Sequence, residues 1–324
     1  MKRNTDSPHT PAASSRGSLF RQTFRRFLSQ KFAVPALIVF LLFCTTALIS
    51  EGYSIWCANR QMEPVYQVPH PEERNMAPCA RHLLGTDYLG RDVLLRAVAA
   101  SRTAMKVGLI ASLLSALLGV ALGMMAGYFG GWIDDIVVWI YSTFASMPTL
   151  LFILAFALLV KGFLSAPLAS GFQEVCRALN TEPGMMAVYL GIGLTGWVSL
   201  CRVVRAETMR LRTMQYVTAA RSLGAGHGRI LFHHIIPNLM HLVIIYFTMR
   251  FAFAVMTEVI VSYLGLGVQF EPSWGAMISD GQGQLWRGIW WEAAAATGFL
   301  FVLVLSLNIL GDALRDALDP RLKT

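Results

Sequence analysis

Long apolar segments alternate with short polar ones along most of the chain. Six of the apolar segments have about 20 residues, the length that crosses the hydrocarbon core of a bilayer. They are Phe32–Ser50, Met105–Tyr128, Ile136–Val160, Met185–Cys201, Leu239–Tyr263 and Ala293–Gly311. Every backbone polar group needs an internal partner inside lipid, so these segments are expected to be helices. The pattern predicts an all-α integral membrane protein with six transmembrane helices.

The composition agrees with this prediction. Apolar residues form 55% of the 324-residue chain and charged residues only 14%, and the mean hydropathy is +0.52. These values are far from those of soluble domains. The first apolar segment is long enough to stay in the bilayer, which argues against a cleavable signal peptide. We expect one polytopic domain with polar tails.

Lysine and arginine are concentrated in two of the polar regions. The first 31 residues carry seven of them against one acid, and residues 202–238 carry six arginines against one acid. Residues 51–101 are balanced, with five arginines and six acids. The positive-inside rule therefore predicts that both termini and the 202–238 loop are cytoplasmic. The net charge of +8 then reflects topology, and we expect no nucleic-acid partner.

These observations divide the chain into regions. We expect a cytoplasmic tail at residues 1–31, a first span at 32–50 and a periplasmic loop at 51–104. A core of five further spans follows at 105–311, and a cytoplasmic tail at 312–324 ends the chain. Within the first tail, apolar and basic residues alternate at helical spacing over residues 19–31. This segment is either an interfacial amphipathic helix or simply the charged flank of the first span.

The second apolar segment has small residues at every fourth position. They are Ala111, Ser115, Gly119, Gly123 and Gly127. Such a face lets helix backbones approach closely in a membrane, where burial of apolar surface does not drive association. It is expected to serve helix packing, either within this chain or at a contact with a second subunit.

Two ionisable residues interrupt the fifth apolar segment, Arg250 near its middle and Glu258 two turns later. Eight residues of helix rise about 12 Å, which is too far for the two side chains to pair directly. Charged residues in a span face protein or water. Arg250 is interpreted as a residue of a translocation path or as the partner of an acid on another subunit. Glu258 is interpreted as a structural or gate residue.

No residue pattern points to catalysis, a cofactor or a metal site. The chain lacks the GxxxxGK[ST] loop that binds nucleotide phosphates and lacks HExxH. The five cysteines have neither metal-ligand spacing nor a CxxC motif, although Cys57, Cys79 and Cys176 fall on the expected periplasmic side. Asp134 and Asp135 follow a Gly-Gly turn, where acids stabilise a helix N-terminus.

The polar stretch between the fourth and fifth segments has its own local signals. Thr218 is expected to cap a short helix over Ala219–Leu223, and Gly224 to end that helix in a left-handed conformation. Pro237 is expected to fix the entry into the fifth segment. A short helix on a loop cannot bury its own apolar side, so it should dock on a partner.

This stretch, YVTAARSLGAGHGRILFHHIIPN, resembles the cytoplasmic coupling loop of bacterial ABC-importer permeases of the dipeptide/oligopeptide (and nickel) transport family. The residues of this loop that either match the family or form its expected short helix are Tyr216, Thr218, Ala219, Ala220, Gly224, His234, Pro237 and Asn238. Further family-like motifs follow in order. They are LGTDYLGRD (84–92), AGYFGG (126–131), SYLGLG (262–267), PSWG (272–275) and LDPR (318–321).

The resemblance implies a six-helix permease of the "C" type, with an ABC importer type I core and no covalent chemistry of its own. It also implies a second, non-identical permease, two ATP-binding subunits and a periplasmic or lipid-anchored binding protein that delivers peptides. ATP-driven motion of the coupling loop would then open the path alternately to each side. Thr218 stands where family members usually have glutamate, and Trp139 and Ser142 replace the usual Arg and Asp.

Alternative functions remain at this point. A nickel or glutathione importer of the same family would have the same motifs. A proton-coupled carrier usually has more spans and more intramembrane acids than the nearly solitary Glu258. A membrane scaffold without transport would not explain the coupling-loop resemblance. Neighbouring genes for a sister permease, ATPases and a binding protein would distinguish these classes.

Overall fold

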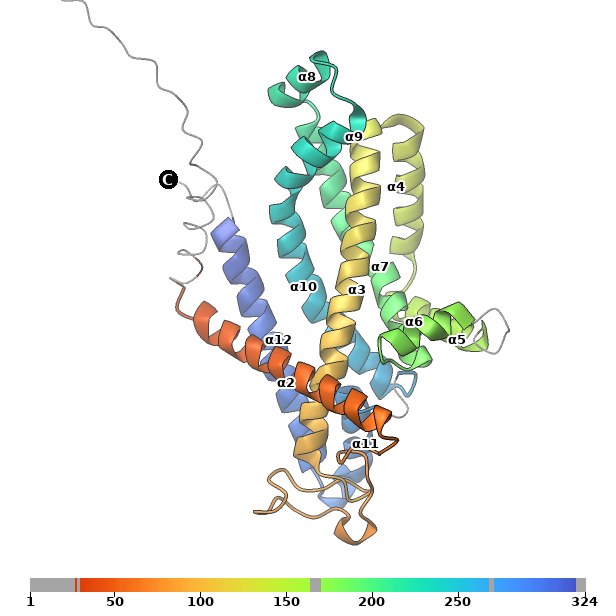
Figure 1. Cartoon of the computed structure of the whole chain (residues 1–324), viewed down its shortest axis with the longest axis vertical. Helices are drawn as coiled ribbons and strands as arrows, with labels where there is room; N and C mark the ends of the chain where they lie inside the picture. The colour runs from red at the N-terminus through yellow and green to blue at the C-terminus, as the bar shows by residue number, and fades with distance from the viewer. Residues whose placement is uncertain (1–26, 28–29, 164–169, 268–270, 319–324) are drawn as a thin grey trace, which may run out of the picture.

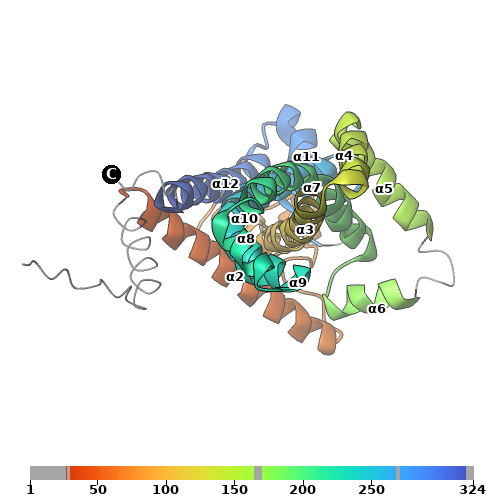
Figure 2. The same ribbon diagram turned by 90° about the horizontal axis from the view of Figure 1, so that it is seen from above.

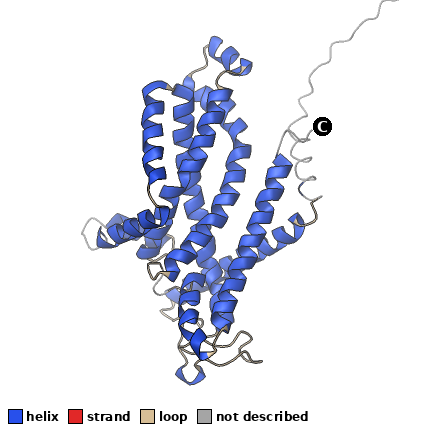
Figure 3. Cartoon of the chain, turned by 180° about the vertical axis from the view of Figure 1, so that it is seen from behind, coloured by secondary structure: helices blue, strands red, loops and turns tan. Residues whose placement is uncertain are grey.

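In the described part of the computed structural model, helices are the regular secondary structure (Figure 3), and an isolated bridge joins Thr86 and Asp92. The structure describes residue 27 and residues 30–163, 170–267 and 271–318. The expected interfacial helix over residues 19–31 lies almost entirely outside these ranges. Most of the long helices run along the major axis of the molecule, whereas the first, Ala33–Asn59, lies obliquely across it (Figure 1). The prediction of an all-α membrane protein is confirmed.

Five helices are long and apolar enough to cross a membrane within the described ranges. They are α2 (Ala33–Asn59), α3 (Val93–Phe129), α7 (Pro183–Leu211), α10 (Ile236–Tyr263, with its preceding turns) and α12 (Trp291–Leu318). Viewed from above, α3, α7 and α10 form the middle of the molecule, whereas α2 lies at its edge (Figure 2).

The third predicted span is not one straight helix. It consists of α4 (Gly131–Ser146) and α5 (Thr149–Phe163), which meet at an angle of 95°. The break falls at Met147, whose backbone is extended, with φ −85° and ψ 135°. Pro148 follows it, and a residue before proline is sterically disfavoured in the helical region. The expectation of a single helix over Ile136–Val160 was therefore wrong, and the proline is the cause.

Most helices extend beyond the apolar segments that predicted them. α2 continues nine residues past Ser50, and α3 begins twelve residues before Met105. The predicted loop at 51–104 is therefore non-helical only between Arg60 and Asp92, apart from the short turn Pro71–Glu73. Likewise α7 runs to Leu211 and α12 to Leu318. Hydropathy marks where a helix leaves the membrane. The ends of the helix itself are set by capping groups, such as Asp92 at the start of α3, which accepts the Leu95 N–H.

Residues 60–92 form one end of the molecule (Figure 1) and are tied to the bundle by buried polar contacts. The Asp87 carboxylate accepts hydrogen bonds from the backbone N–H groups of Leu89 and Arg91. Arg96 of α3 lies 2.6 Å from Asp87 and 2.9 Å from Glu292 of α12. These three side chains are almost completely buried. The LGTDYLGRD motif thus joins the loop to two spans.

A second cluster of charges lies at the same end. The Arg102 guanidinium of α3 is 2.6 Å from the Glu271 carboxylate, and Lys106 is 2.8 Å from Glu51 of α2. The Lys106 ammonium also donates to the backbone carbonyls of Leu179 and Asn180, just beyond α6 (Ser170–Ala178). The connection that contains α6 is thereby fixed to α3.

The segment after α10 contains two of the family-like motifs. Ser273 caps α11 (Trp274–Gln284) by accepting the Ala276 N–H. The indole of Trp274 is buried and donates to the Ala97 carbonyl of α3. The turn Leu285–Arg287 then leads to α12. The PSWG motif therefore anchors α11 in the core of the bundle.

Candidate functional site

The end of the molecule opposite residues 60–92 carries a pair of short helices. α8 (Gln215–Ser222) projects beyond the bundle, and α9 (His227–Ile230) lies at the end of the bundle (Figure 1). A π-helical turn, η3 (Leu231–Ile235), joins α9 to α10 without a break. The predicted loop at 202–238 is therefore mostly helical, because α7 and α10 both extend into it.

Gly224 ends α8 as the sequence predicted. Its φ is +81°, a conformation that L side chains rarely adopt. The Ala225 N–H binds the Ala220 carbonyl, and the Gly224 N–H binds the Arg221 carbonyl, which together form a Schellman motif. The predicted start of α8 was wrong. The N-cap is Met214, and Thr218 lies one turn inside the helix, where its hydroxyl donates to the Met214 carbonyl.

A small apolar anchor holds α8 and α9 on the bundle. Val217 of α8, Ile230 of α9 and Ile235 of η3 are completely buried and pack with residues of α7 such as Leu211. On the outer side Ala219 is exposed and Ala220 half-buried, and Leu223 is 88% exposed. The inner face of α8 is therefore satisfied within the chain, while its C-terminal end presents apolar surface to the outside.

Three of the predicted loop residues meet across the loop. The Asn238 amide donates to the His234 carbonyl at 2.6 Å and contacts the Tyr216 hydroxyl at 3.4 Å. The rings of Tyr216 and His234 lie 6.2 Å apart. Pro237 occupies the first turn of α10, as predicted. These contacts connect the start of α8 to the start of α10.

Two polar pairs near this end were not predicted as pairs. Asp134 of α4 binds the Arg205 guanidinium of α7 through both carboxylate oxygens. The Tyr128 hydroxyl at the end of α3 lies 3.0 Å from Nδ1 of His227 in α9. Sequence reasoning had placed Asp134 only as an acid at a helix N-terminus. The lysine and arginine counts gave no indication of which spans are neighbours.

The small-residue face of α3 lies against α7. The Ser115 hydroxyl donates to the Gly193 carbonyl at 2.9 Å. A Cβ atom added at Gly119 would lie 3.0 Å from the Trp197 carbonyl oxygen, and at Gly123 it would lie 2.6 Å from that of Cys201. At Gly127 the corresponding distance to the Arg205 carbonyl is 2.5 Å. Close backbone approach along this face therefore requires residues without side chains.

Arg250 lies in the middle of α10, one helical turn beyond Phe247. Its guanidinium carbon is 4.9 Å from the centre of the Phe253 ring. A Cβ atom at Gly196 of α7 would lie only 2.2 Å from one of its nitrogens. The side chain is half-buried, and no described residue forms a hydrogen bond or an ion pair with it.

Glu258 lies two turns further along α10 and is 1% exposed. The Ser262 hydroxyl donates to its carboxylate at 2.6 Å. Arg250 and Glu258 form no ion pair with each other. The structure thus brings the loop residues together at one end and leaves these two ionisable residues as separate features inside the bundle.

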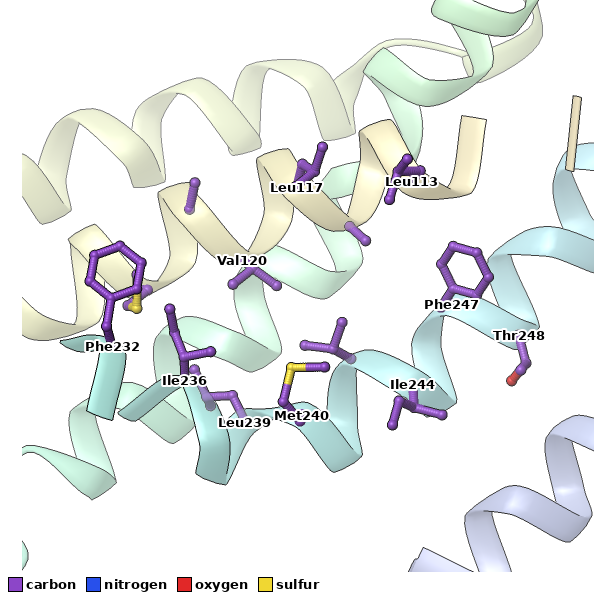
Figure 4. A pocket seen from close by; sticks show the side chains of 14 residues that line it. Leu113, Leu117, Val120, Phe232, Ile236, Leu239, Met240, Ile244, Phe247 and Thr248 are labelled. Atoms are coloured by element: carbon purple, nitrogen blue, oxygen red, sulfur yellow. The ribbon is translucent and has the colours of Figure 1, made fainter. Parts of the chain in front are cut away.

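A groove of about 560 Å³ runs between α3 and α10. Figure 4 shows its lining, which includes Leu113, Leu117 and Val120 of α3 and Ile236, Met240 and Ile244 of α10. Among the lining residues only Thr248 has a polar side chain. Such a surface suits apolar helix faces or lipid chains, because a charged group entering it would find no partner.

Known proteins resemble this chain over most of its length. The family described as binding-protein-dependent transport system inner membrane component matches residues 119–324. The oligopeptide transport system permease protein OppC of Bacillus subtilis is 31% identical over 94% of this chain and 91% of its own length. The dipeptide transport system permease protein DppC of the same organism is 32% identical over 99% of this chain and 90% of its own.

A third relative is named for a different substrate. The glutathione transport system permease protein GsiD of Pectobacterium atrosepticum is 30% identical over 94% of this chain and 92% of its own length. The matched family region contains the projecting helices, α10 and most of the small-residue face. The chain therefore belongs to the family of binding-protein-dependent transport system inner membrane components and is a multi-pass permease subunit of an ABC importer.

Proposed function

We propose that this permease carries peptides, delivered by an extracytoplasmic binding protein, across the cytoplasmic membrane of a bacterium. It would act beside a second, non-identical permease and two ATP-binding subunits, and would perform no covalent chemistry itself. The relatives named for oligopeptides and dipeptides cover nearly the whole chain, which supports peptides as the substrate. A nickel importer has less support, whereas glutathione is itself a small peptide and stays within the proposed class.

One observation carries the proposed coupling to ATP hydrolysis. α8 projects from the bundle, is anchored by Val217 on one side and leaves Leu223 88% exposed at its end. Exposed apolar surface on a projecting helix is typical of a docking site for another protein. The cationic residues around it favour the cytoplasmic side of the membrane. We infer that Tyr216–Asn238 forms the contact with the ATP-binding subunits.

Replacement of Ala220 tests this contact. Ala220→Trp adds a large ring to a half-buried position on α8, so it should overfill the interface. We expect the ATP-binding subunits to be lost from the purified complex while the two permeases still co-purify. Ala80→Trp, at an exposed position of the opposite end, is the matched control. Unchanged subunit content and unchanged ATP hydrolysis in Ala220→Trp would contradict the proposal.

The orientation can be tested separately. We infer that both termini and Arg221 are cytoplasmic, while Glu72 and Gln173 lie outside, because basic residues concentrate in the first tail and in residues 202–238. Cysteines introduced at Glu72 and Gln173, in a variant without native cysteines, should react with an impermeant maleimide in intact cells. A cysteine at Arg221 should react only after the membrane is opened. Reaction at Arg221 alone would reverse the topology.

A further inference from the structure

Arg250 differs from three other arginines that lie within the bundle. Arg96, Arg102 and Arg205 each have a carboxylate partner in the same chain. The described part of the chain offers Arg250 no hydrogen-bond acceptor and no acid. A charge in the middle of a span is costly unless it faces protein, water or a counter-ion. Since no described residue supplies an anion, the counter-ion of Arg250 is expected from solvent, a partner subunit or the cargo.

The surroundings of Arg250 hold the guanidinium without using its N–H groups. The ring of Phe253 lies 4.9 Å from the guanidinium carbon. Gly196 leaves the space on α7 that the nitrogens occupy, since any side chain there would collide with them. The neighbouring Ser115 hydroxyl already donates to the Gly193 carbonyl. The Nε–H group is buried and meets no acceptor among the described residues. The arrangement is a positive charge whose donors no described residue uses, which suits a carboxylate.

The adjacent surface of α10 is apolar and adaptable. Met249 is 57%, Phe253 49% and Met256 46% exposed, and helical spacing places them on one side. Methionine side chains are flexible and polarizable, so they can make favourable contacts with groups of different shapes. A fixed charge beside such a surface fits a ligand with one constant carboxylate and variable side chains. It does not fit a free divalent cation, which the charge would repel.

We propose that Arg250 binds the C-terminal carboxylate of the peptide during its passage through the transporter. This inference rests on the proposed function. α10 is continuous with η3 and α9, so the charge lies on the helix that leads directly to the proposed docking loop. A permanent ion pair with a partner subunit would have to break whenever this helix moved relative to that subunit. A carboxylate that binds and leaves with the cargo does not have this conflict.

The test uses the complete transporter, with its partner subunits, in cells that lack other peptide uptake. Uptake of tri-alanine is compared for the native chain, Arg250→Gln, Arg250→Lys and the control Leu305→Gln. The control introduces the same amide at an exposed position of the neighbouring span α12 but keeps the charge of Arg250. We expect Arg250→Gln to lower the maximal rate by about tenfold, as for loss of a charge-assisted hydrogen bond. KM, which reflects capture by the binding protein, should change little.

Further measurements separate binding of the substrate from a structural role. Arg250→Lys should restore most of the rate, Leu305→Gln should match the native chain, and all variants should keep their subunits on purification. Tri-alanine amide has no C-terminal carboxylate, so Arg250→Gln should reduce its uptake less than it reduces the uptake of tri-alanine.

Loss of the second permease in Arg250→Gln would overturn the proposal, since it would assign the partner acid to that subunit. A native rate in Arg250→Gln would overturn it as well. Failure of the native transporter to carry any peptide would instead refute the proposed function, and this inference with it.

Discussion

The two ends of the molecule differ in how completely their polar and apolar groups are satisfied. At one end, Asp87, Arg96 and Glu292 are buried together and join a loop to two spans. At the other end, α8 is held by a few apolar side chains and projects with Leu223 exposed. We call the first the completed end, because its central buried charges are paired within the chain, whereas the second presents surface for another protein. A single subunit can thus contain one end that pairs its own charges and one end that leaves surface for its complex.

Removal of Arg96 should be the most damaging change to the completed end. Arg96→Met leaves the carboxylates of Asp87 and Glu292 buried without their shared cation, and breaking a buried pair typically costs about 3–5 kcal/mol. We expect a large fall in the thermal unfolding midpoint of the purified complex. Arg81→Met removes the exposed Arg81–Glu73 pair at the same end and should cost about 1 kcal/mol or less. Equal effects of the two variants would show that the buried cluster does not hold this end together.

The glycine face of α3 tests whether the interior is as tightly packed as the completed end. Gly123→Ala places a methyl group 2.6 Å from the Cys201 carbonyl oxygen, so α3 and α7 must separate. Overpacking of this kind costs about 1–3 kcal/mol. Gly298→Ala in α12 meets nothing within 4 Å and should be neutral or stabilising, because alanine favours helix. Denaturation of both variants in detergent measures the difference, and a neutral Gly123→Ala would mean that the two helices can move apart freely.

The projecting end should respond in activity more than in stability. Gly224→Val forces a branched residue into φ +81°, a local strain of roughly 1–2 kcal/mol. We expect normal abundance in the membrane but loss of coupled transport. Gly288→Val, which imposes a similar positive φ (+77°) at the opposite end and meets nothing within 4 Å, is the control and should keep coupled transport. Full substrate uptake by Gly224→Val at normal abundance would contradict the proposed role of the α8 end.

The smallest expected effect concerns pH at the completed end. Burial raises the pKa of Asp280, and Asp87 adds to this, although Arg96 and Arg91 oppose it. A carboxyl whose pKa is raised in the folded state stabilises the fold at low pH, and this contribution is lost as pH rises through the folded pKa. In Asp280→Asn, stability should therefore fall less steeply as the pH rises above the ordinary pKa of aspartate. Unfolding midpoints measured between acid and neutral pH check this, and an unchanged slope would contradict it.

The membrane-spanning helices were largely predictable because hydropathy reports burial in lipid directly. The left-handed Gly224 and the entry at Pro237 were also predictable, since both are local properties of the backbone. The break at Met147 was missed because an apolar run of suitable length conceals a proline in its middle. A stricter reading of Pro148 would have found it.

Contacts between distant segments were not predictable from one sequence. Arg96 and Glu292 are 196 residues apart, and Asp134 and Arg205 are 71 apart. Nothing in their local sequence shows which helices are neighbours. The N-cap of α8 was missed for a different reason. A threonine hydroxyl can donate to a carbonyl in the preceding turn as easily as it can cap a helix, and Thr218 does the former.

The bend between α4 and α5 has a consequence for biosynthesis. These helices have 16 and 15 residues, so each is roughly 22–24 Å long and shorter than the hydrocarbon core. Neither can insert stably alone, and the extended backbone at Met147 needs shelter from lipid. Ile153 and Ala157 of α5 are buried, and a Cβ added at Gly191 of α7 would lie 3.5 Å from Ile153. We therefore expect this part of the chain to reach its final position in the bilayer only after α7 has left the ribosome and entered beside it.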